Sequence, residues 1–578
     1  MVDQLSWKVG GQQGEGIDST GEVFSLAQNR FGYYLYTYRH FSSRIKGGHT
    51  NNKIRVSTKE IGAVSDDLDI LVAFDQETID VNYHELHDQG IIIADSKFNP
   101  TAPEDCKAKL YAVPFSEIAN ELGTSLMKNM VAIGATSAIL GQPTEDYREV
   151  VQGVYGRKGE KVVEKNMDAL KRGAEYFNEQ AGGPIERLQL EKADGQKRMF
   201  MIGNDAISLG FLVGGVRFMS AYPITPASEI MEYMIKHLPK HGGTVIQTED
   251  EIAAATMAIG ANYAGVRTIT ASAGPGLSLM MEAIGLSGIT ETPLVIVDTQ
   301  RGGPSTGLPT KQEQSDLMAM IYGTHGEIPK VVIAPSTAEE AFYDAAEALN
   351  IAEEFQCPVI VLSDLQLSLG KQSVSPLDYS KTEIRRGKVP TGDLPELEAK
   401  EYFKRYEDTE DGVSPRVFPG MKNGIHHVTG VEHDETGKPS EVAGNRQTQM
   451  DKRHRKLNNL NFKTPVYKNV RHAEADVLVV GFNSTRGAIE EMIPRLEADG
   501  IKVNHAQIRL IHPFPTKEME ELVDAAKTVI VVENNSTGQL ANIMKMNLGN
   551  LDKIKNLLKY NGNPFLPTEI YTKCKELL

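Results

Sequence analysis

Glu251, Thr225 and Arg301 are the side chains best suited to chemistry in this sequence. Glu251 precedes a run of small residues that fits a closely packed helix, so its carboxylate is expected to be partly desolvated and suited to proton exchange with a neutral heterocycle. Glu249 is the alternative for this role. The structural alternative is an acidic first helical turn that complements the helix dipole.

Two prolines, Pro223 and Pro226, flank Thr225 and hold its hydroxyl on a stiff turn. Thr225 can also cap a helix that has Pro226 in its first position. Arg301 follows an apolar segment, residues 293–297, and its polar extension. Because the carboxyl ends of strands line the ligand crevice of open α/β sheets, a guanidinium there can bind a carboxylate in bidentate fashion.

Short apolar, β-branched segments alternate with helical patterns along most of the chain, which predicts an α/β fold of three layered domains. We expect these at residues 1–183, with a parallel sheet, at 199–369 and at 474–578. Residues 370–473 are rich in charge, proline and glycine and predict an extended linker that packs over a partner. An acidic block at 407–411 and a basic block at 452–456 carry opposite charges. The expected strands are residues 5–9, 70–74, 90–95, 266–271, 293–298, 330–333, 358–362, 476–481, 503–508 and 529–532.

A glycine-rich turn, residues 10–16, follows the first expected strand. It does not fit the dinucleotide spacing G-x-G-x-x-G. Basic residues come next, and such a cluster suits a ligand with several phosphates. The structural alternative is a plain tight turn followed by a solvated basic face, and for any single one of these residues it is about as well supported as phosphate binding. The basic residues are Arg39, His40, Arg44, Lys46, His49, Lys53 and Arg55.

Composition excludes several classes of protein. The 578 residues carry a formal net charge of −16, which argues against a nucleic-acid partner. The first residues lack the apolar core of a targeting segment, and the apolar runs are too short to span a bilayer, so a cytoplasmic protein is expected. Cys106, Cys357 and Cys574 give no disulfide framework, and an iron–sulfur cluster needs about four cysteine ligands.

A group of histidines in the expected linker could suggest a metal site. His426, His427, His433 and Asp434 lack a supporting apolar pattern. We therefore expect them to be surface or interface residues and assign no metal to this chain.

Four pieces of sequence in order resemble the alpha subunit of the 2-oxoacid:ferredoxin oxidoreductases. They are residues 221–229 (AYPITPASE), 248–255 (TEDEIAAA), 271–276 (ASAGPG) and 298–307 (DTQRGGPSTG). Residues 480–515 resemble the C-terminal, transketolase-like domain of the same family, and the first block resembles its gamma domain, fused ahead of the alpha domains. The resemblance implies that residues 199–369 form the pyrimidine-binding domain for thiamine diphosphate.

The same resemblance implies roles for single residues. Glu251 matches the glutamate that bonds the aminopyrimidine ring and favours the tautomer that deprotonates the thiazolium carbon. Thr225 matches the contact to the oxo-acid end of the substrate, and Arg301 matches the arginine that binds its carboxylate. The further cofactor contacts implied are Tyr222, Pro223, Ile224, Gly274, Pro275 and Gly276 for thiamine diphosphate, and Gly11, Gly14, Gly16, Arg44 and Lys46 for coenzyme A.

Two expected patterns are missing from the sequence: the Gly-Asp-Gly motif with a following Asn that holds magnesium and the diphosphate, and cluster-binding cysteines. In the family both lie on a beta subunit. The resemblance therefore implies thiamine diphosphate shared with that subunit, Mg²⁺ and a [4Fe–4S] cluster on it, and an α2β2 assembly.

The implied reaction is oxidative decarboxylation of a 2-oxoacid, with coenzyme A as co-substrate and ferredoxin as acceptor. The fused gamma domain favours 2-oxoglutarate as substrate, while pyruvate or a broad specificity stays open. A thiamine-dependent dehydrogenase or transketolase relative, and a non-catalytic regulatory subunit that binds coenzyme A or a nucleotide, are the alternatives.

Overall fold

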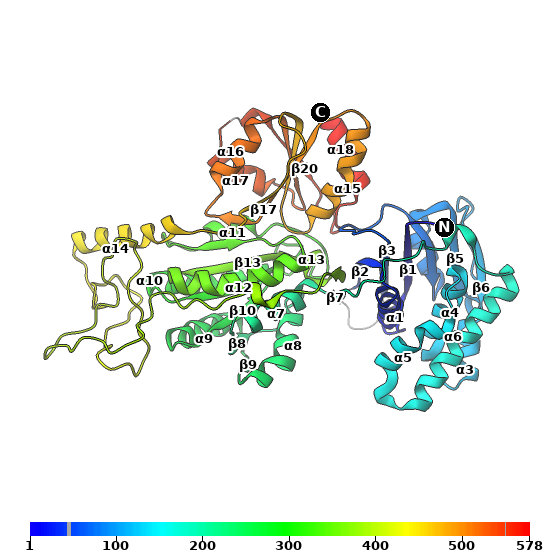
Figure 1. The fold of residues 1–578 in the computed structure, drawn as a ribbon, viewed down its shortest axis with the longest axis horizontal. Helices are drawn as coiled ribbons and strands as arrows, with labels where there is room; N and C mark the ends of the chain where they lie inside the picture. The colour runs from blue at the N-terminus through cyan, green and yellow to red at the C-terminus, as the bar shows by residue number, and fades with distance from the viewer. Residues whose placement is uncertain (43–47, 550) are drawn as a thin grey trace.

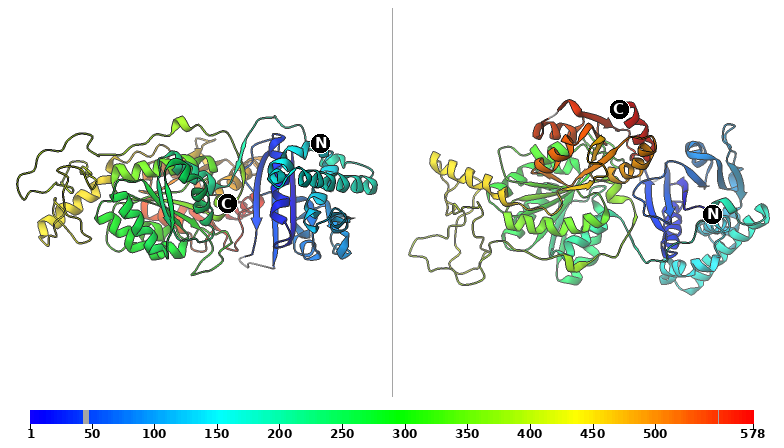
Figure 2. Two further views of the ribbon diagram at one scale, coloured as in Figure 1. Left: turned by 90° about the horizontal axis from the view of Figure 1, so that it is seen from below. Right: turned by 45° about the horizontal axis from the view of Figure 1, so that its top comes forward.

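The computed structural model describes residues 1–42, 48–549 and 551–578. This part of the chain contains three sheets flanked by helices, which confirms the predicted α/β class. The first domain stands beside the other two, and the C-terminal domain lies on top of the middle one (Figure 1). An arm from residues 370–473 projects from the middle domain at the end opposite to the first domain (Figure 2).

The first sheet is mixed rather than parallel. Its order is β6-β5-β4-β1-β3-β2-β14-β7, and only β6 to β1 run parallel. The expectation of a parallel sheet is wrong because the basic segment after the first helix forms an antiparallel pair, β2 with β3, instead of a crossover. The domain's elements are β1 (Gln4–Gln12), α1 (Ile17–Arg30), β2 (Tyr34–His40), β3 (His49–Ser57), β4 (Leu68–Ala73), α2 (Gln76–Asn82), β5 (Leu86–Asp95), β6 (Lys109–Val113), α3 (Phe115–Glu121), α4 (Lys128–Leu140), α5 (Arg148–Tyr155) and α6 (Glu160–Ala181).

The middle sheet has the order β18-β12-β13-β11-β10-β8-β9, and all its strands but β18 run parallel. Its central strands are fully buried, apolar and β-branched, as expected for a parallel sheet covered on both faces. Its elements are α7 (Gly203–Val213), β8 (Phe218–Ala221), α8 (Ser228–His237), β9 (Thr244–Gln247), α9 (Glu251–Tyr263), β10 (Thr268–Ser272), α10 (Gly274–Ile289), β11 (Leu294–Gln300), α11 (Leu317–Tyr322), β12 (Val331–Ile333), α12 (Ala338–Phe355), β13 (Pro358–Asp364) and α13 (Leu365–Leu369).

The third sheet, β15-β17-β16-β19-β20, belongs to the C-terminal domain, and one hydrophobic core continues from the middle domain into it. Its elements are β15 (Val466–Asn469), β16 (Ala475–Gly481), α15 (Thr485–Ala498), β17 (Val503–Ile508), α16 (Thr516–Asp524), β19 (Ala526–Glu533), α17 (Gln539–Asn547), β20 (Ile554–Leu558) and α18 (Pro567–Leu577).

Strands pass from one domain to another. β7 (Met199–Met201) and β14 (Gln372–Val374), which flank the middle domain in sequence, complete the sheet of the first domain next to β2. β18 (Leu510–His512), from the C-terminal domain, pairs with β12 of the middle sheet. The domains are therefore joined by backbone hydrogen bonds as well as by side-chain contacts.

The arm is held by buried ion pairs. It contains α14 (Ala443–Arg455), and Lys452 and Lys456 at its end contact the carboxylate of Glu291 at 2.8 and 2.6 Å. All three side chains are fully buried. Two lysines of the basic block are thus buried, and the Glu291 carboxylate, which lies just beyond the end of α10, compensates their charge.

No helix in the described part of the chain combines the length and the apolar character needed to cross a bilayer.

Candidate functional site

The three predicted side chains lie at one edge of the middle sheet. The parallel strands β8, β10 and β11 end at Ala221, Ser272 and Gln300, and the predicted segments follow these ends directly. Glu251 follows β9 in the same way. The structure therefore brings Thr225, Glu251, Gly274–Gly276 and Arg301 to the crevice that open α/β sheets use for ligands.

Glu251 is the first residue of α9, and its side chain faces inward. The carboxylate of Asp250 caps this helix by accepting a hydrogen bond from the backbone N–H of Ala253 at 2.7 Å. Glu251 is only 7% exposed, whereas Glu249 is exposed. The three acids of this segment therefore have different positions: Asp250 caps the helix, Glu249 is exposed, and Glu251 is buried.

Gly276 lets the first turn of α10 approach Glu251. A methyl group at Gly276 would lie 2.0 Å from Ser272 Oγ and 2.8 Å from Glu251 Oε1. Gly274 is equally restricted, since a methyl group there would lie 2.8 Å from Asp316 Oδ2. Pro275, between them, is half-buried. The glycines are therefore needed for a narrow wall beside a buried carboxylate.

The replacement Gly276→Ala is expected to lower the free energy of unfolding by about 1–3 kcal/mol, because the added methyl overpacks the wall. Gly285→Ala is the matched control in the same helix, since a methyl group there meets nothing within 4 Å. That control should raise stability by about 0.5–1 kcal/mol. Denaturant unfolding followed by circular dichroism measures both, and an unchanged midpoint for Gly276→Ala would contradict the packing described here.

Arg301 is 7% exposed and reaches the segment that holds Thr225. Its Nη1 donates to the carbonyl oxygen of Thr225, and Nη2 donates to that of Thr306 at 3.4 Å. Its Nε is buried without a partner among the described residues. Burial lowers the pKa of Arg301, and the charge of Asp316 opposes this shift. An unpartnered donor on a buried guanidinium fits a bound carboxylate.

Thr225 does not cap a helix. α8 begins at Ser228 with Ala227 as its N-cap, so the capping interpretation is wrong. The backbone N–H of Ala227 donates instead to the carbonyl of Ile224 at 2.8 Å, and Thr225 lies in a half-buried turn. Tyr222, the first residue after β8, is 38% exposed. Among the residues that the structure describes, the Thr225 hydroxyl makes no hydrogen bond and is therefore available for another contact.

Two buried carboxyl groups near this site, Asp298 and Asp316, were not predicted from the sequence. Asp298, in β11, is fully buried, and burial followed by the charge of Asp316 raises its pKa well above the usual range. Burial and the charge of Glu313 raise the pKa of Asp316 to about 6. An aspartate that continues an apolar strand was the signal available in the sequence for Asp298.

The glycine-rich segment begins later than expected. Gly11 belongs to β1, and the turn follows from Gln13. Gly14 and Gly16 have φ angles of 96° and 87°, which other residues rarely adopt, and Gly16 is the N-cap of α1. Several nearby polar atoms are buried without partners among the described residues: Gln13 Oε1, Glu15 Oε2, His49 Nδ1 and Asn129 Oδ1.

The basic residues after this turn differ in whether their side chains are free to bind a ligand. Lys53 and Arg55 are buried and paired, with Glu85 at 3.0 Å and Glu491 at 2.6 Å, so they are not free for a ligand. Arg39 pairs with an exposed aspartate on α1, and His40 contacts Lys311 of the middle domain at 2.9 Å. Arg44 and Lys46, expected to contact coenzyme A, lie outside the described residues.

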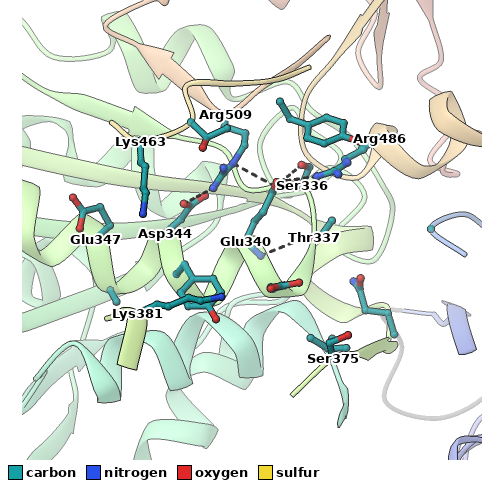
Figure 3. A pocket seen from close by; sticks show the side chains of 18 of the residues that line it. Ser336, Thr337, Glu340, Asp344, Glu347, Ser375, Lys381, Lys463, Arg486 and Arg509 are labelled. Atoms are coloured by element: carbon teal, nitrogen blue, oxygen red, sulfur yellow. Dashed lines mark hydrogen bonds and ion pairs between the residues drawn. The ribbon is translucent and has the colours of Figure 1, made fainter. Parts of the chain in front are cut away.

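A large cavity of about 1070 Å³ lies elsewhere, where the three domains meet. Glu340 lies at its centre and contacts Arg486 at 2.8 Å and Arg509 at 3.4 Å, while Asp344 contacts Arg509 at 2.6 Å (Figure 3). These charges compensate one another. The network connects α12 of the middle domain to the C-terminal domain and is separate from the Glu251 crevice.

The histidines of the arm take up different positions in the structure. Among the described residues no group of three or more His, Cys, Asp or Glu side chains could hold a metal ion. His433, expected at a surface or interface, is fully buried against the ring of Tyr406 at 4.1 Å, because the arm folds back on itself there. His426 is half-buried and bonds Tyr263 of α9 at 3.1 Å.

Two of the three cysteines are structural. Cys357 and Cys574 are fully buried, and burial raises the pKa of each to about 12. Such thiols are poor metal ligands and poor nucleophiles because the thiolate is not formed. Cys106 is half-buried.

Three parts of the chain match known families. Residues 210–452 match the family described as "Pyruvate flavodoxin/ferredoxin oxidoreductase, thiamine diP-bdg". Residues 6–176 match "Pyruvate ferredoxin/flavodoxin oxidoreductase", and residues 475–570 match "Pyruvate:ferredoxin oxidoreductase core domain II".

Full-length relatives and a solved structure agree with these matches. The chain is 34% identical to a 2-oxoacid:ferredoxin oxidoreductase subunit alpha of Sulfolobus, over 98% of this chain and 96% of the relative. It is 30% identical to the 2-oxoglutarate oxidoreductase subunit KorA of Mycobacterium tuberculosis, over 98% and 91%. A 2-oxoglutarate:ferredoxin oxidoreductase from Magnetococcus marinus, solved with 2-oxoglutarate, coenzyme A and succinyl-CoA bound, superposes with a TM-score of 0.93 at 36% identity, over 100% of both chains.

Proposed function

Because the chain belongs to the family of 2-oxoacid:ferredoxin oxidoreductase alpha subunits, we propose that it converts 2-oxoglutarate and coenzyme A to acyl-CoA and carbon dioxide and passes electrons to ferredoxin. The observation that carries this proposal is the buried Glu251 carboxylate beside Gly276, at the same sheet edge as Arg301. The 2-oxoglutarate-binding relative from Magnetococcus marinus supports this substrate over pyruvate.

The crevice fits the aminopyrimidine part of thiamine diphosphate. That ring needs a carboxylate in apolar surroundings and a wall without side chains, and Glu251 and Gly276 meet these needs. When bound, thiamine diphosphate supplies the carbon nucleophile for the oxo group and accommodates the charge left by loss of carbon dioxide. Glu251 holds and returns the proton at the ring nitrogen, with Tyr222, Pro223 and Ile224 at the mouth of the crevice.

Arg301 binds the carboxylate next to the oxo group of the substrate, and the Thr225 hydroxyl contacts the oxo-acid end. The guanidinium is fixed by its bonds to the carbonyls of Thr225 and Thr306, so its Nε edge is presented in a defined orientation. Its burial strengthens an ion pair with the substrate, since the local dielectric is low.

The variant Arg301→Lys is expected to raise KM for the 2-oxoacid by about 10- to 100-fold, because a hydrogen bond to a charged group contributes about 1.5–3 kcal/mol. Lysine keeps the charge but cannot bind in bidentate fashion. Arg217→Lys, which changes an exposed arginine elsewhere in the middle domain, is the control. Steady-state kinetics decides, and an unchanged KM for Arg301→Lys would refute the bidentate role.

A beta subunit completes this site in our proposal and carries the Mg²⁺, the diphosphate contacts and a [4Fe–4S] cluster. The exposed face of α9 supports a docking surface there. Ile252 and Met257 on α9 and Leu279 on α10 are 48%, 41% and 52% exposed, and residues 252–264 contain no charged side chain. An uncharged, exposed helix face is unusual in a chain with a net charge of −16. We further propose an α2β2 assembly that acts in the cytoplasm.

Coenzyme A is proposed to approach the glycine-rich turn of the first domain. The unpartnered polar atoms around Gly14 and Gly16 support this, and so does the contact of His40 with Lys311 of the middle domain. Arg39, 39% exposed in its side chain, is the described cation best placed for a phosphate.

The direct test is viologen reduction by this chain, alone and co-expressed with a candidate beta subunit, with thiamine diphosphate, Mg²⁺, coenzyme A and either 2-oxoglutarate or pyruvate. We expect activity only with the partner and faster turnover of 2-oxoglutarate. Faster turnover of pyruvate would overturn the substrate assignment. A stable complex that binds cofactor and cluster yet reduces nothing would favour a regulatory subunit.

A further inference from the structure

The chain on either side of Arg301 is fixed by a segment that follows it in the same loop. The N–H of Gly302, directly after Arg301, donates to the carbonyl oxygen of Lys311 at 3.1 Å. On the other side, the side-chain oxygen of Gln300 accepts a hydrogen bond from the N–H of Asp316 at 3.2 Å. Both chain neighbours of Arg301 are therefore bonded to one later segment of the loop.

The C-terminal domain holds this segment, residues 311–318, which we call the support segment. α17 of that domain lies above α11, which begins within the segment (Figure 1). Backbone hydrogen bonds join the N–H of Gln312 to the carbonyl of Gly562 at 3.1 Å, and the N–H of Gln314 to that of Asn534 at 2.7 Å. The position of the support segment therefore depends on another domain.

The side chain of Gln314 bonds both domains. Its oxygen accepts a hydrogen bond from the N–H of Asn534 at 2.9 Å, so these two residues exchange a pair of hydrogen bonds. Its nitrogen donates to Asp364 Oδ2 at 2.8 Å and to the carbonyl of Phe482 at 3.2 Å. Asn535 Nδ2 donates to the Gln314 carbonyl at 3.0 Å. One amide thus connects the end of β13 in the middle sheet with the ends of β16 and β19 in the C-terminal domain.

These contacts are closed to water. Gln314 is fully buried, and Asn534 and Asn535 are each 1% exposed. An apolar side chain would fill the same volume without the cost of desolvating an amide. Buried polar groups that find their partners hold one rigid arrangement. The amide of Gln314 is therefore expected to set the position of the support segment and not only to fill a core.

Gln539 makes a second attachment near the far end of the support segment. Its Oε1 accepts a hydrogen bond from the N–H of Met318 at 2.9 Å, and its Nε2 donates to the carbonyl of Ser315 at 2.7 Å. Gln539 is the first residue of α17 and is only half-buried. Because it lies outside the core, its replacement disturbs the fold less than a replacement of Gln314.

We propose that Gln314 and Gln539 are positioning residues for Arg301, through which the C-terminal domain sets the direction of the guanidinium in the substrate crevice. The inference rests on the proposed role of Arg301 as the ligand of the substrate carboxylate. Bidentate binding requires two N–H groups to face the carboxylate together, so a small shift of the support segment weakens it. Neither glutamine contacts the substrate.

Affinity for a phosphonate analogue of the 2-oxoacid, which cannot lose carbon dioxide, tests the proposal without turnover. In the assembled complex, isothermal titration calorimetry should show about tenfold weaker binding for Gln314→Met and a smaller loss for Gln539→Met. Gln449→Met, which removes a buried amide from the arm, is the matched control and should bind as the wild type does. Wild-type affinity in both Gln314→Met and Gln539→Met would overturn the proposal.

A double-mutant cycle with Arg301→Lys separates positioning from general damage to the fold. If Gln314 acts through Arg301, Gln314→Met should cost less than about twofold in affinity when it is added to Arg301→Lys. A damaged fold would lower the affinity by the same factor in both backgrounds, and equal factors would refute the positioning role. In steady-state kinetics, KM for the 2-oxoacid should rise in Gln314→Met while KM for coenzyme A stays unchanged.

Arg301→Lys alone distinguishes this inference from the function on which it rests. If that variant binds the analogue as tightly as the wild type, Arg301 is not the carboxylate ligand, and the proposed role and the inference both fail. If it binds weakly while both glutamine variants bind normally, the function stands and the positioning role is refuted. Thermal melts identify any variant that does not fold, and Gln539→Met keeps the test available if Gln314→Met unfolds.

Discussion

Glu251→Gln in the assembled complex is expected to lower kcat by about 100- to 10,000-fold, the usual contribution of a group that transfers protons in the rate-determining steps. Glutamine keeps the size and the hydrogen bonding of the side chain but cannot exchange the proton with the aminopyrimidine ring. Because Glu251 is 7% exposed, solvent is poorly placed to replace it. Viologen reduction with saturating 2-oxoacid and coenzyme A measures the effect.

Glu249→Gln is the matched control for this experiment. It makes the same chemical change two residues earlier, on an exposed side chain, and should leave kcat within about twofold. The opposite result, a large loss for Glu249→Gln and a small one for Glu251→Gln, would assign the role to the other acid. Cofactor binding should be measured in parallel, so that a loss of occupancy is not mistaken for a loss of proton transfer.

Glu291→Gln is expected to destabilise the chain by about 3–5 kcal/mol, because it leaves two cations, Lys452 and Lys456, buried without a counter-charge. Circular dichroism during denaturant unfolding measures the loss. The arm should also become sensitive to proteases, since these contacts hold its end to α10. Glu145→Gln, which breaks an exposed pair with Arg148, should change neither measurement.

This cluster also predicts a pH dependence. Burial alone would raise the pKa of Glu291, but the charges of Lys452 and Lys456 outweigh it and hold that pKa below the ordinary value of 4.5. The stabilising contribution is therefore complete above about pH 4.5 and is lost as the pH falls below it. The wild type should lose more stability than Glu291→Gln between pH 5 and pH 3, and parallel losses would contradict this account.

The sequence could group the three candidate side chains because they follow strands of one parallel sheet. Carboxyl ends of parallel strands meet at one edge, so Thr225, Glu251 and Arg301 could be grouped from strand patterns and the family resemblance alone. The directions in which the side chains of Glu249, Asp250 and Glu251 point could not be predicted from the sequence. They depend on Asp250 being the helix cap, which sets the rotation of α9 and turns Glu251 inward.

Charge patterns were less informative where long-range partners decide burial. The burial of Lys452 and Lys456 could not be predicted, since Glu291, which compensates their charge, lies far away in the sequence. His433 was predicted to be a surface or interface residue, because the packing of its ring against Tyr406 depends on how the arm folds back. Lys53 and Arg55 resembled phosphate ligands, yet each is neutralised by a carboxylate from a distant segment. Strands β2 and β3 were themselves not predicted, because the basic residues of this segment were interpreted as a possible phosphate-binding cluster.

The first sheet determines what would happen if the chain were cleaved between the first domain and the middle domain. Its strand β2 is continued by β14, where the N–H of Thr37 donates to the carbonyl of Lys371 at 2.9 Å, and then by β7. A cleavage within the exposed residues 192–196 would therefore not release two independent proteins. The fragments would remain bound through a continuous intermolecular sheet, in the manner of β-strand addition. The covalent linkage between the first domain and the rest is thus dispensable for their association, and this architecture can exist as one polypeptide or as two.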